Sequence, residues 1–557
     1  MAKIKIMALG GLGENGKNMY LIEVNERIFI LDAGLKYPEI DMYGVDAVVP
    51  NISYLIENKN RIEGIFLSHG HCDNMGAVSY LLKHIPVRVY GTHLTISILE
   101  HELMASKMQI KKFKLYRIND TKTLKFGDVK VVFYNSTHSI PESIGIAVVT
   151  TDGAIVYSTD FNFGLQFDGK YDTSFNQIAE ISKSNVLVLL SESLGLSSIN
   201  RVVNDSLLEY NFNALLNKAK KRIVVCAFST DLNRIQKVID LSISRGKKIA
   251  IVNSKKQHVI DVAIENKYLR IPKESHVVLK LIDENNKNDL DDLVVIVTGE
   301  RFEPYTIIKR MSTGEDKLIH LDPLDKVVLM CPPIPGTEKY TTNAVNILSK
   351  NGCEIITYDK SVLRSTHASR EDLKLLYAMM KPKYVMPIKG EYRHLYEHKQ
   401  LAYSVGYNEN TCLMLDNGQI AEFENGKLIS VDNYVEVGDV FINGNLIGEV
   451  TEEVIHDRET LALEGVIVVN IIYDLRQRKI ESDPIIVYKG VVLNDKMEVL
   501  NQNISSVCIK HVNAYLTRKE LDLGGLKNTL TNEIGKVLHR ILKKHINIVI
   551  NLLENKN

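Results

Sequence analysis

The sequence lacks an excess of charge of either sign, because 68 Lys and Arg residues are balanced by 68 Asp and Glu residues. A formal net charge of zero argues against a chain that binds nucleic acid over its whole surface, although it is compatible with a local basic cleft. Long apolar runs are also missing: no stretch reaches the roughly 18 residues of a transmembrane helix. The N-terminal apolar run is too short for a signal peptide. We therefore expect a cytoplasmic protein that does not enter the membrane.

Cysteines in CxxC spacing are missing as well. The six cysteines are scattered along the chain, which predicts reduced thiols in a cytosolic protein. We find neither internal repeats nor low-complexity linkers. With 45% hydrophobic and 24% charged residues, the composition is that of an ordinary globular protein.

The length of 557 residues suggests three or four domains. Residues 1–205 alternate short β-rich segments with Gly and polar breaks, which predicts an α/β or α+β domain. In residues 206–364, strands such as "IVVCAFS" and "LVVIVTG" are followed by helices or loops, which indicates an inserted α/β domain. Residues 365–450 return to strands and turns, and residues 451–557 predict a small α+β domain.

The segment "FLSHGHCDNMGA" combines an apolar strand with alternating polar side chains. His69, His71 and Asp73 follow the strand directly, so a loop can aim all three at one point. Imidazole and carboxylate ligands at this spacing suit zinc or a similar divalent ion. His138 in "NSTHSIPES" and Asp160 in "IVYSTDFNF" supply matching chemistry beside two further strands. The alternative for any one of these histidines is a hydrogen-bonded structural role.

These motifs together resemble the metallo-β-lactamase fold, and the inserted domain resembles its β-CASP branch. The sequence is most similar to the ribonuclease J family of bacterial RNA maturation and decay proteins, through "GGLGENGKNMY", "LDAGLKYP", "YGVDAVVPN", "CPPIPGTE" and "STHASREDLK" in the family's order. The resemblance covers nearly the whole chain. It implies an αββα sandwich with an inserted β-CASP α/β domain and a small C-terminal α+β domain. It also implies a role in rRNA and mRNA processing.

In that family two metal ions share a bridging aspartate and activate a water for attack on phosphorus. The resemblance assigns the first ion to four residues that are all present: His69, His71, His138 and Asp160. It assigns the second ion to Asp73, the next residue, Asp160 and a histidine of a PxHGE motif. Here those two variable positions hold Asn74 and Lys389. We therefore expect at most one zinc, manganese or magnesium ion per chain.

The two departures differ in kind. Asn74 still offers a weak amide oxygen, whereas the Lys389 ammonium has no lone pair for a metal and would repel one. An ammonium placed near Asp73 and Asp160 would instead neutralise the carboxylates that the missing ion would hold. The alternative is that Lys389 points into solvent.

Several positions that the resemblance assigns to RNA contact also depart from the family pattern. The family's HxSGH phosphate-binding motif corresponds to five residues here: Leu363, Arg364, Ser365, Thr366 and His367. The resemblance assigns a catalytic role, or the remnant of one, to Asp73, Glu192 and His367. Arg364 is a candidate phosphate contact, and its alternative is an ordinary surface arginine.

A second loop departs further. The family's TGSQGEP loop corresponds to "TGERFEP", in which Glu300, Arg301 and Phe302 replace smaller or neutral residues. A carboxylate at Glu300 is placed to repel RNA phosphate, and Phe302 removes a flexible turn. Cys72, among the metal-ligand candidates, is more typical of a small buried thiol than of a ligand.

Two functions fit this sequence. The first is an RNA-processing subunit with little or no nuclease activity, because the chain resembles the second, catalytically degenerate paralogue that some bacteria carry beside an active enzyme. The second is a slow metal-dependent 5′-to-3′ exoribonuclease, with or without endonuclease activity, that works with one ion. A DNA nuclease of the β-CASP branch fits less well. The expected partners are RNA, a second copy of the chain, a catalytic paralogue and other RNA-degradation factors.

Overall fold

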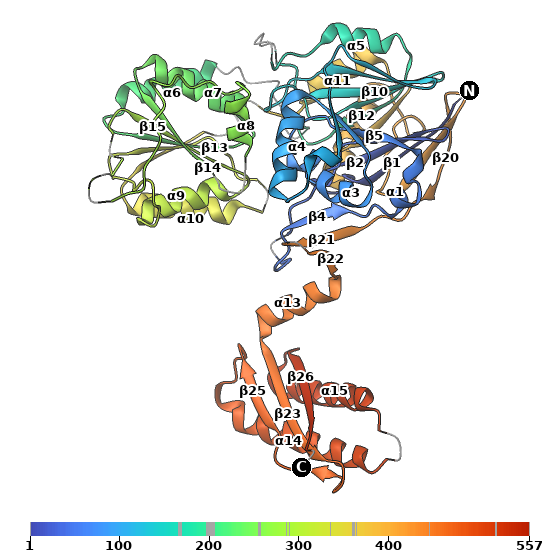
Figure 1. Cartoon of the computed structure of the whole chain (residues 1–557), viewed down its shortest axis with the longest axis vertical. Coiled ribbons are helices and arrows are strands. Elements are labelled where there is room, and N and C mark those ends of the chain that lie inside the picture. Colours follow the sequence, from blue (N-terminus) through green and yellow to red (C-terminus); the bar gives the residue numbers. More distant parts are fainter. Residues whose placement is uncertain are drawn as a thin grey trace. The chain divides into compact units, whose positions relative to one another are not determined.

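The computed structural model divides into two compact units, residues 1–37 with 47–440 and residues 38–46 with 441–557 (Figure 1). The described residues are 2–39, 41–164, 170–196, 206–253, 258–283, 285, 287–288, 290–334, 336–358, 362–363, 365–444, 446–518 and 521–555. Each unit has its own hydrophobic core and is considered separately.

The first unit begins with an eight-stranded sheet in the order β20-β19-β1-β2-β3-β5-β6-β7. Its strands are β1 (Lys3–Gly10), β2 (Met19–Val24), β3 (Arg27–Leu31), β5 (Ile62–Phe66), β6 (Arg88–Gly91), β7 (Lys114–Arg117), β19 (Gln419–Glu424) and β20 (Lys427–Tyr434). The helices between these strands are α1 (Ser53–Glu57), α2 (Cys72–Met75), α3 (Val78–His84) and α4 (His93–Ala105). The short strand β4 (Ala47–Pro50) is not part of this sheet. The helix α4 packs against β6 and β7.

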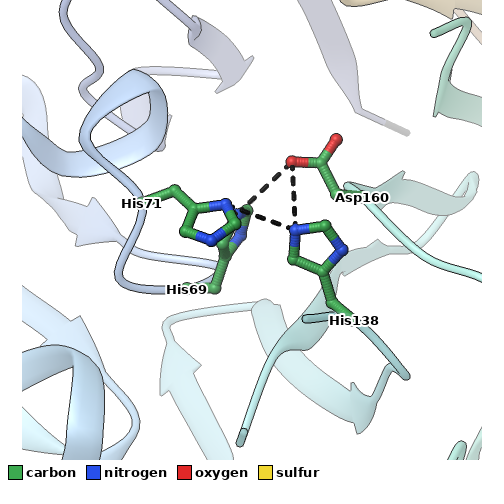
Figure 2. A group of neighbouring side chains, drawn as sticks. All are labelled: His69, His71, His138 and Asp160. Atoms are coloured by element: carbon green, nitrogen blue, oxygen red, sulfur yellow. Dashed lines mark hydrogen bonds and ion pairs between the residues drawn. The ribbon is translucent and has the colours of Figure 1, made fainter. Parts of the chain in front are cut away.

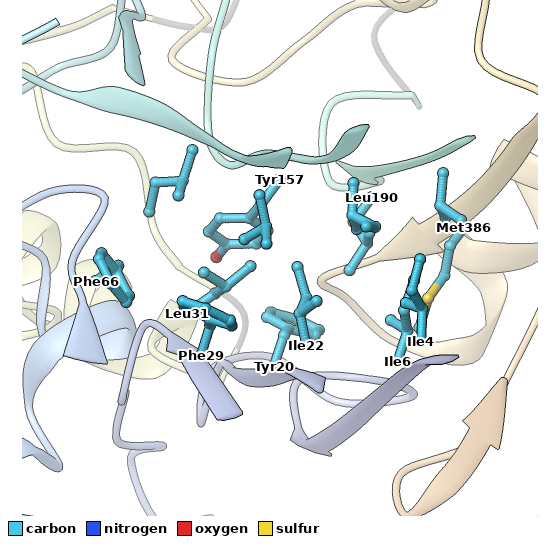
Figure 3. Close-up of a cluster of buried hydrophobic side chains, with 14 of the residues drawn as sticks. Ile4, Ile6, Tyr20, Ile22, Phe29, Leu31, Phe66, Tyr157, Leu190 and Met386 are labelled. Carbon is cyan, nitrogen blue, oxygen red and sulfur yellow. The ribbon is translucent and has the colours of Figure 1, made fainter. Parts of the chain in front are cut away.

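A six-stranded sheet in the order β18-β12-β11-β10-β9-β8 packs against the first sheet. Its strands are β8 (Thr123–Phe126), β9 (Val129–Asn135), β10 (Ile144–Thr150), β11 (Gly153–Ser158), β12 (Val186–Glu192) and β18 (Tyr384–Ile388). Figure 3 shows how Ile22 and Phe29 of one sheet face Tyr157 and Leu190 of the other. The apolar side chains that alternate along these strands therefore fill the space between two sheets.

Three helices cover the outer face of the six-stranded sheet: α5 (Phe175–Ser182), α11 (Arg370–Met380) and α12 (Tyr392–Ser404). A second apolar cluster joins Ile181 of α5 and Leu376 of α11 to Val156 of the sheet. Helices outside two packed sheets give an αββα sandwich. This confirms the fold class that the sequence predicted for the first domain.

The inserted domain is a five-stranded parallel sheet in the order β14-β15-β13-β16-β17. Its strands are β13 (Ile223–Phe228), β14 (Lys248–Asn253), β15 (Leu293–Gly299), β16 (Lys326–Leu329) and β17 (Glu354–Thr357). Its helices are α6 (Ser206–Lys218), α7 (Leu232–Ser244), α8 (Val259–Glu265), α9 (Glu303–Thr313) and α10 (Glu338–Lys350). Figure 1 shows α6 and α7 on one face of the sheet and α9 and α10 on the other.

After this insertion the chain returns to the sandwich, since β18 pairs with β12 and β19 pairs with β1. The predicted boundaries at residues 205/206 and 364/365 remain predictions, because residues 197–205 and 364 are not among the described ones. The return matters for the site, because β18 delivers Lys389 to the same sheet edge as the residues that follow β11 and β12.

The second unit contains a sheet of β24, β23, β25 and β26, covered on one face by two long helices. Its elements are β21 (Asp439–Asn443), β22 (Leu446–Val450), α13 (Glu452–Glu464), β23 (Val466–Asp474), β24 (Lys479–Ile480), β25 (Ile485–Lys489), α14 (Met497–Leu516), α15 (Leu523–Leu542) and β26 (Asn547–Glu554). This is the α+β architecture expected for residues 451–557. Among the described residues, none of the helices has both the length and the apolarity to cross a bilayer.

Candidate metal centre

The loop after β5 is fixed by close backbone packing. A methyl group on Gly34 would lie 1.6 Å from the Asp73 carbonyl oxygen, so a residue with a Cβ atom does not fit there. The amides of Asn18 and Ala33 donate to the carbonyls of Asp73 and Asn74 at 3.1 and 2.7 Å. These contacts fix the direction in which the side chains from residue 69 to residue 74 project.

The other polar residues of the centre follow strands of the six-stranded sheet. His138 follows β9, Asp160 follows β11, Glu192 ends β12 and Lys389 follows β18. Strands β9 and β11 are both antiparallel to β10, and β11, β12 and β18 are parallel. All four strands therefore end at one edge of the sheet, and this edge faces the loop that carries His69.

The structure brings together the four residues predicted for a first ion (Figure 2): His69, His71, His138 and Asp160. The His71 Nδ1 atom lies 3.0 Å from His69 Nε2 and 3.3 Å from His138 Nε2. Asp160 Oδ2 lies 3.3 Å from His69 Nε2 and 4.0 Å from His138 Nε2. Ligand bonds of about 2.1 Å to a tetrahedral ion place neighbouring ligand atoms about 3.4 Å apart. The donor set therefore fits one zinc-like ion.

Hydrogen bonds on the far side of the rings set the histidine tautomers. His138 Nδ1 donates to the Thr366 carbonyl at 2.7 Å, which leaves the lone pair on Nε2. The Ser68 hydroxyl donates to Asp32 and so accepts from His69 Nδ1 at 2.9 Å. Burial and the neighbouring histidines hold the pKa of His71 well below its ordinary value, and burial does the same for His138. Neutral imidazoles are the form that binds metal.

Lys389 lies where a second ion would be expected. Its Nζ atom is 2.5 Å from Asp160 Oδ2, 3.1 Å from Asn74 Oδ1 and 3.6 Å from Asp73 Oδ2. The side chain is 1% exposed, so the alternative of a solvent-facing lysine is wrong. These positions do not fit a second metal ion, because an ammonium already occupies the space between their oxygens.

The electrostatics of this pair favour the charged forms of both groups. Burial alone would lower the pKa of Lys389, but Asp160 and Asp73 raise it above its ordinary value. Burial alone would raise the pKa of Asp160, but the Lys389 ammonium and interactions with His367 and His69 hold it well below its usual range. Lys389 is therefore an ammonium, and Asp160 is a carboxylate.

The backbone around Lys389 is held by the glycine-rich loop after β1. Lys389 has a φ of 58°, and its amide donates to the Gly11 carbonyl at 3.0 Å. The Gly390 amide donates to the Glu14 carbonyl at 3.2 Å. The "GGLGENG" segment therefore acts as a turn beside the centre, and it directs the lysine inward.

Glu192, which is buried, and His367, which is partly exposed, form a second pair next to Asp160. His367 Nδ1 lies 2.7 Å from Glu192 Oε2 and 3.6 Å from Asp160 Oδ1. Glu192 also accepts from the amides of Phe161 and Ala368 at 2.8 and 3.0 Å. Burial alone would lower the pKa of His367, but Glu192 and Asp160 raise it to about 10. The centre thus holds two cationic side chains among its carboxylates.

Comparison with known proteins identifies the chain's relatives. Residues 12–187 match the metallo-beta-lactamase superfamily, residues 220–348 the "Ribonuclease J, beta-CASP domain" and residues 453–555 the "Ribonuclease J C-terminal domain". Residues 360–412 match a "Zn-dependent metallo-hydrolase RNA specificity domain". "Ribonuclease J 2" of Staphylococcus aureus strain NCTC 8325 is 32% identical over 98% of this chain and 97% of its own length. The chain belongs to the ribonuclease J family.

A second relative agrees with this assignment, and one solved structure shares the fold. "Ribonuclease J 2" of Streptococcus pyogenes serotype M3 is 34% identical over 98% of both chains. A crystal structure of a protein of unknown function from Enterococcus faecalis V583 aligns with a TM-score of 0.52 at 16% identity. It covers 76% of this chain and 100% of its own and shows the likeness of the fold. As a ribonuclease J-type protein with an RNA specificity domain, the chain is associated with RNA binding and with a divalent metal.

The segment that corresponds to the ribonuclease J phosphate-binding motif is held by contacts within the protein. Leu363 is 5% exposed, so its side chain is buried and offers no polar group. The Ser365 hydroxyl donates to the His367 carbonyl and accepts from its amide, at 2.9 and 3.2 Å. The Thr366 carbonyl accepts from His138. Arg364 lies outside the described residues. Among the described residues of this motif, His367 is the one with a charged side chain, and its Nδ1 atom lies 3.6 Å from Asp160 Oδ1.

A narrow cleft opens beside His138, between the sandwich and the inserted domain. Ser139, Asn162 and Ser365 line one side, and Asp231, Arg234 and Lys237 of the α7 region line the other. Arg234 pairs with Asp231 at 2.5 Å. The α7 side of this cleft could not be predicted from the sequence, because lysine and arginine near a helix start are common on any surface.

Asp32 and Asn74 form a network that the sequence did not predict. Asn74 Nδ2 donates to Asp32 Oδ2 at 2.5 Å, and Asp32 also accepts from the Ser68 hydroxyl and the Tyr157 hydroxyl. Both residues are fully buried. Asp32 lies in the "LDAG" motif, which is part of the family resemblance but does not by itself indicate a role for this aspartate. Its position directly after β3 was the signal that could have marked it.

Proposed function

We propose that this chain is an RNA-binding ribonuclease J-type protein with weak or no nuclease activity of its own. In this proposal the centre binds one divalent ion, and the Lys389 ammonium takes the place of the second. The observation that carries the proposal is the set of distances from Lys389 Nζ to Asp160, Asn74 and Asp73, at 2.5, 3.1 and 3.6 Å.

The residues that would hold the ion are His69, His71, His138 and Asp160. When bound, a divalent ion polarises a phosphoryl oxygen and lowers the pKa of a coordinated water. Three imidazoles and one carboxylate favour zinc over magnesium, which prefers all-oxygen ligands. Manganese is the next candidate.

The remaining residues of the centre have electrostatic and orienting roles. Lys389 neutralises Asp160 and Asp73, and the imidazolium of His367 is oriented by Glu192 at 2.7 Å. An ammonium stabilises phosphoryl charge less effectively than a second dication, and it does not supply an activated water. A site that clamps both the attacking and the leaving oxygen needs two metal ions. Low activity follows from that difference.

The protein would therefore act through RNA binding and assembly. We infer that its partner is a catalytic ribonuclease J paralogue, in a hetero-oligomer, with a homodimer as the alternative assembly. The support is chemical: the chain has an RNA specificity domain together with a centre that accommodates one ion. A cytoplasmic location fits this role, and other RNA-degradation factors are further candidate partners.

A second candidate function is a slow nuclease that works with one ion. The intact set of four ligand residues favours it, because these side chains already have the spacing of a tetrahedral site. Such an enzyme would act as a 5′-to-3′ exoribonuclease, an endoribonuclease or both. It differs from the first candidate in whether the isolated protein cleaves RNA.

The test combines elemental analysis with digestion of 5′-monophosphorylated RNA. Purified protein should contain at most one tightly bound transition metal ion per chain, and His71→Ala should lose it. The isolated protein should digest RNA weakly or not at all while retaining RNA at low salt in a filter assay. Two tightly bound ions per chain would refute the proposed centre. Cleavage by the parent that His71→Ala abolishes would favour the second candidate.

A further inference from the structure

The loop between β15 and α9 carries three residues with contacts to other elements: two residues contact the sandwich, and one contacts a helix of the inserted domain itself. Glu300 and Arg301 contact Tyr37 of the sandwich, and Phe302 stacks on Tyr340 of α10. These are the three positions at which the "TGERFEP" segment departs from its family pattern. Each of the three replaced residues therefore makes a specific side-chain contact in this chain.

Glu300 holds a carboxylate next to the loop of the metal centre. The Tyr37 hydroxyl donates to Glu300 Oε2, and Cys72 Sγ lies 3.7 Å from that same oxygen. Cys72 Sγ also lies 3.3 Å from the Tyr37 hydroxyl. Cys72 directly follows His71 in the chain. The Glu300 carboxylate therefore contacts the residue next to a candidate metal ligand.

The two neighbours of Glu300 keep this arrangement in place. The Arg301 guanidinium lies 4.6 Å from the centre of the Tyr37 ring, which is a cation–π distance. The ring of Phe302 stacks on Tyr340 with centroids 4.4 Å apart and planes 16° apart. Arg301 therefore fixes the loop to the sandwich, and Phe302 fixes it to its own domain.

Further acidic groups lie on the same side of the centre. Burial and the nearby Glu300 raise the pKa of Glu102, on α4, to about 8, so this carboxyl is largely protonated at neutral pH and adds little negative charge. Asp73 is the next residue after Cys72 and is 34% exposed. A phosphodiester at the centre thus has the Glu300 carboxylate close by and, beside it, the Asp73 carboxylate, whose charge Lys389 partly offsets at 3.6 Å. At a Debye length of about 10 Å in 0.1 M salt, such charges act on a phosphate at the centre.

We propose that the carboxylate of Glu300, held by Tyr37 and Arg301, weakens RNA binding at the metal centre. The loop from Gly299 to Glu303 is the interdomain latch that fixes it there. This inference rests on the proposed function, because it concerns RNA at the same centre. It adds a cause of low activity that does not depend on the metal ions.

The test compares Glu300→Gln with the parent in RNA filter binding at several salt concentrations. Glutamine keeps the size and an oxygen acceptor for Tyr37 while removing the charge. Glu300→Gln should bind RNA about three- to tenfold more tightly at 50 mM salt, and the gain should shrink as salt rises. The matched control is Glu180→Gln, because Glu180 is an exposed carboxylate on α5 that pairs with Lys183.

The latch itself is tested with Tyr37→Phe, which removes the hydroxyl and keeps the ring under Arg301. Amide hydrogen exchange of the segment 299–303 should be faster in this variant than in the parent. RNA affinity should rise less than in Glu300→Gln, since the carboxylate remains. Unchanged exchange in Tyr37→Phe would overturn the latch.

The outcomes separate this inference from the proposed function. If the parent binds RNA and Glu300→Gln gains no more RNA affinity than Glu180→Gln, the effect of Glu300 on RNA binding is overturned while the proposed function stands. If neither the parent nor Glu300→Gln retains RNA at low salt, the proposed function is refuted and the inference with it. A salt-dependent gain confined to Glu300→Gln supports both.

Discussion

Asn74 and Lys389 are in direct contact, since Lys389 Nζ lies 3.1 Å from Asn74 Oδ1. Asn74 uses its amide nitrogen on Asp32, so its orientation is already fixed by a second buried group. The two positions therefore belong to one polar network, and changes at them should not be additive.

The first prediction is that Asn74→His combined with Lys389→His restores a second metal site. The double variant should bind two ions per chain and cleave RNA at least about tenfold faster than the parent, a gain of about 1.4 kcal/mol in transition-state stabilisation. Lys389→His alone should help more than Asn74→His alone. The former removes the ammonium, whereas the latter places an imidazole beside it. Metal content and single-turnover cleavage of all four proteins measure this.

Two results would contradict this prediction in different ways. A double variant that binds two ions but stays as inactive as the parent would assign the defect to the RNA-binding surface, including Leu363 and Glu300. A double variant that gains neither ions nor activity would mean that these two residues do not mark the second metal position.

The second prediction concerns His398, which is fully buried between Ser193 and Tyr377. Burial lowers the pKa of His398 to about 3. The unfolded chain, with an ordinary histidine pKa near 6.5, therefore binds more protons than the folded chain between those two pKa values. Stability should fall as the pH drops below about 6.5, by roughly 1.4 kcal/mol per pH unit from this residue. Thermal melts from pH 7.5 to pH 5 measure the slope.

The control for this slope is His398→Gln, which cannot take up the proton and keeps hydrogen-bonding groups toward both neighbours. Its melting temperature should be lower than that of the parent at pH 7.5, and the gap should narrow toward pH 5. A gap of constant size across this range would show that His398 does not contribute to the acid sensitivity.

His69 and His71 could be predicted as ligands from their local spacing, whereas the family resemblance assigned the full set of four. His69 and His71 alternate after one strand, and His138 and Asp160 each follow another strand. The direction of Lys389 could not be predicted, because it depends on a positive φ and on a carbonyl from Gly11, far away in the sequence. Contacts of that kind are set by tertiary packing and leave no periodic pattern.

At the level of elements, the close approach of Gly34 to the loop after β5 decides whether the centre forms. The third prediction is that Gly34→Ala destabilises the first unit by about 3 kcal/mol or more, since its methyl group would overlap the Asp73 carbonyl. The same variant should lose the bound ion. Thermal melting and elemental analysis check this.

The matched control is Gly438→Ala, because a methyl group there meets no atom within 4 Å and Gly438 is not among the glycines with a positive φ. It should melt and bind metal like the parent. Retention of the full metal content in Gly34→Ala would show that the loop tolerates the displacement.

The elements themselves were largely predictable, and their partners were less so. Parallel strands such as β13 and β15 appear in the sequence as apolar runs, because both faces of their sheet are covered. The pairing of β19 with β1 joins residues more than 400 positions apart, as in Ile4 with Phe423. Alternation along either strand says which side is buried but not which strand lies beside it. The family resemblance, rather than periodicity, supplied that arrangement.

At the scale of the whole molecule, the two units have separate hydrophobic cores. The fourth prediction is that thermal unfolding shows more than one transition, because each core can be lost without the other. Leu530→Ala, at a fully buried position of α15, should destabilise the second unit by about 2–5 kcal/mol, because it leaves a cavity in the core. The melting temperature of one transition should fall accordingly. Metal content should not change. Calorimetry that shows all transitions shifting together would contradict separate unfolding.

Lys389 gives the centre a counter-charge that belongs to the polypeptide. A bound ion stabilises a protein by an amount that depends on its free concentration, so an ordinary two-metal site responds to supply and to chelators. The ammonium between Asp73 and Asp160 has no such dependence, because every folded copy carries it from the moment of synthesis. The positive charge between Asp73 and Asp160 therefore does not depend on the free metal concentration. Neither metal starvation nor metal excess changes it.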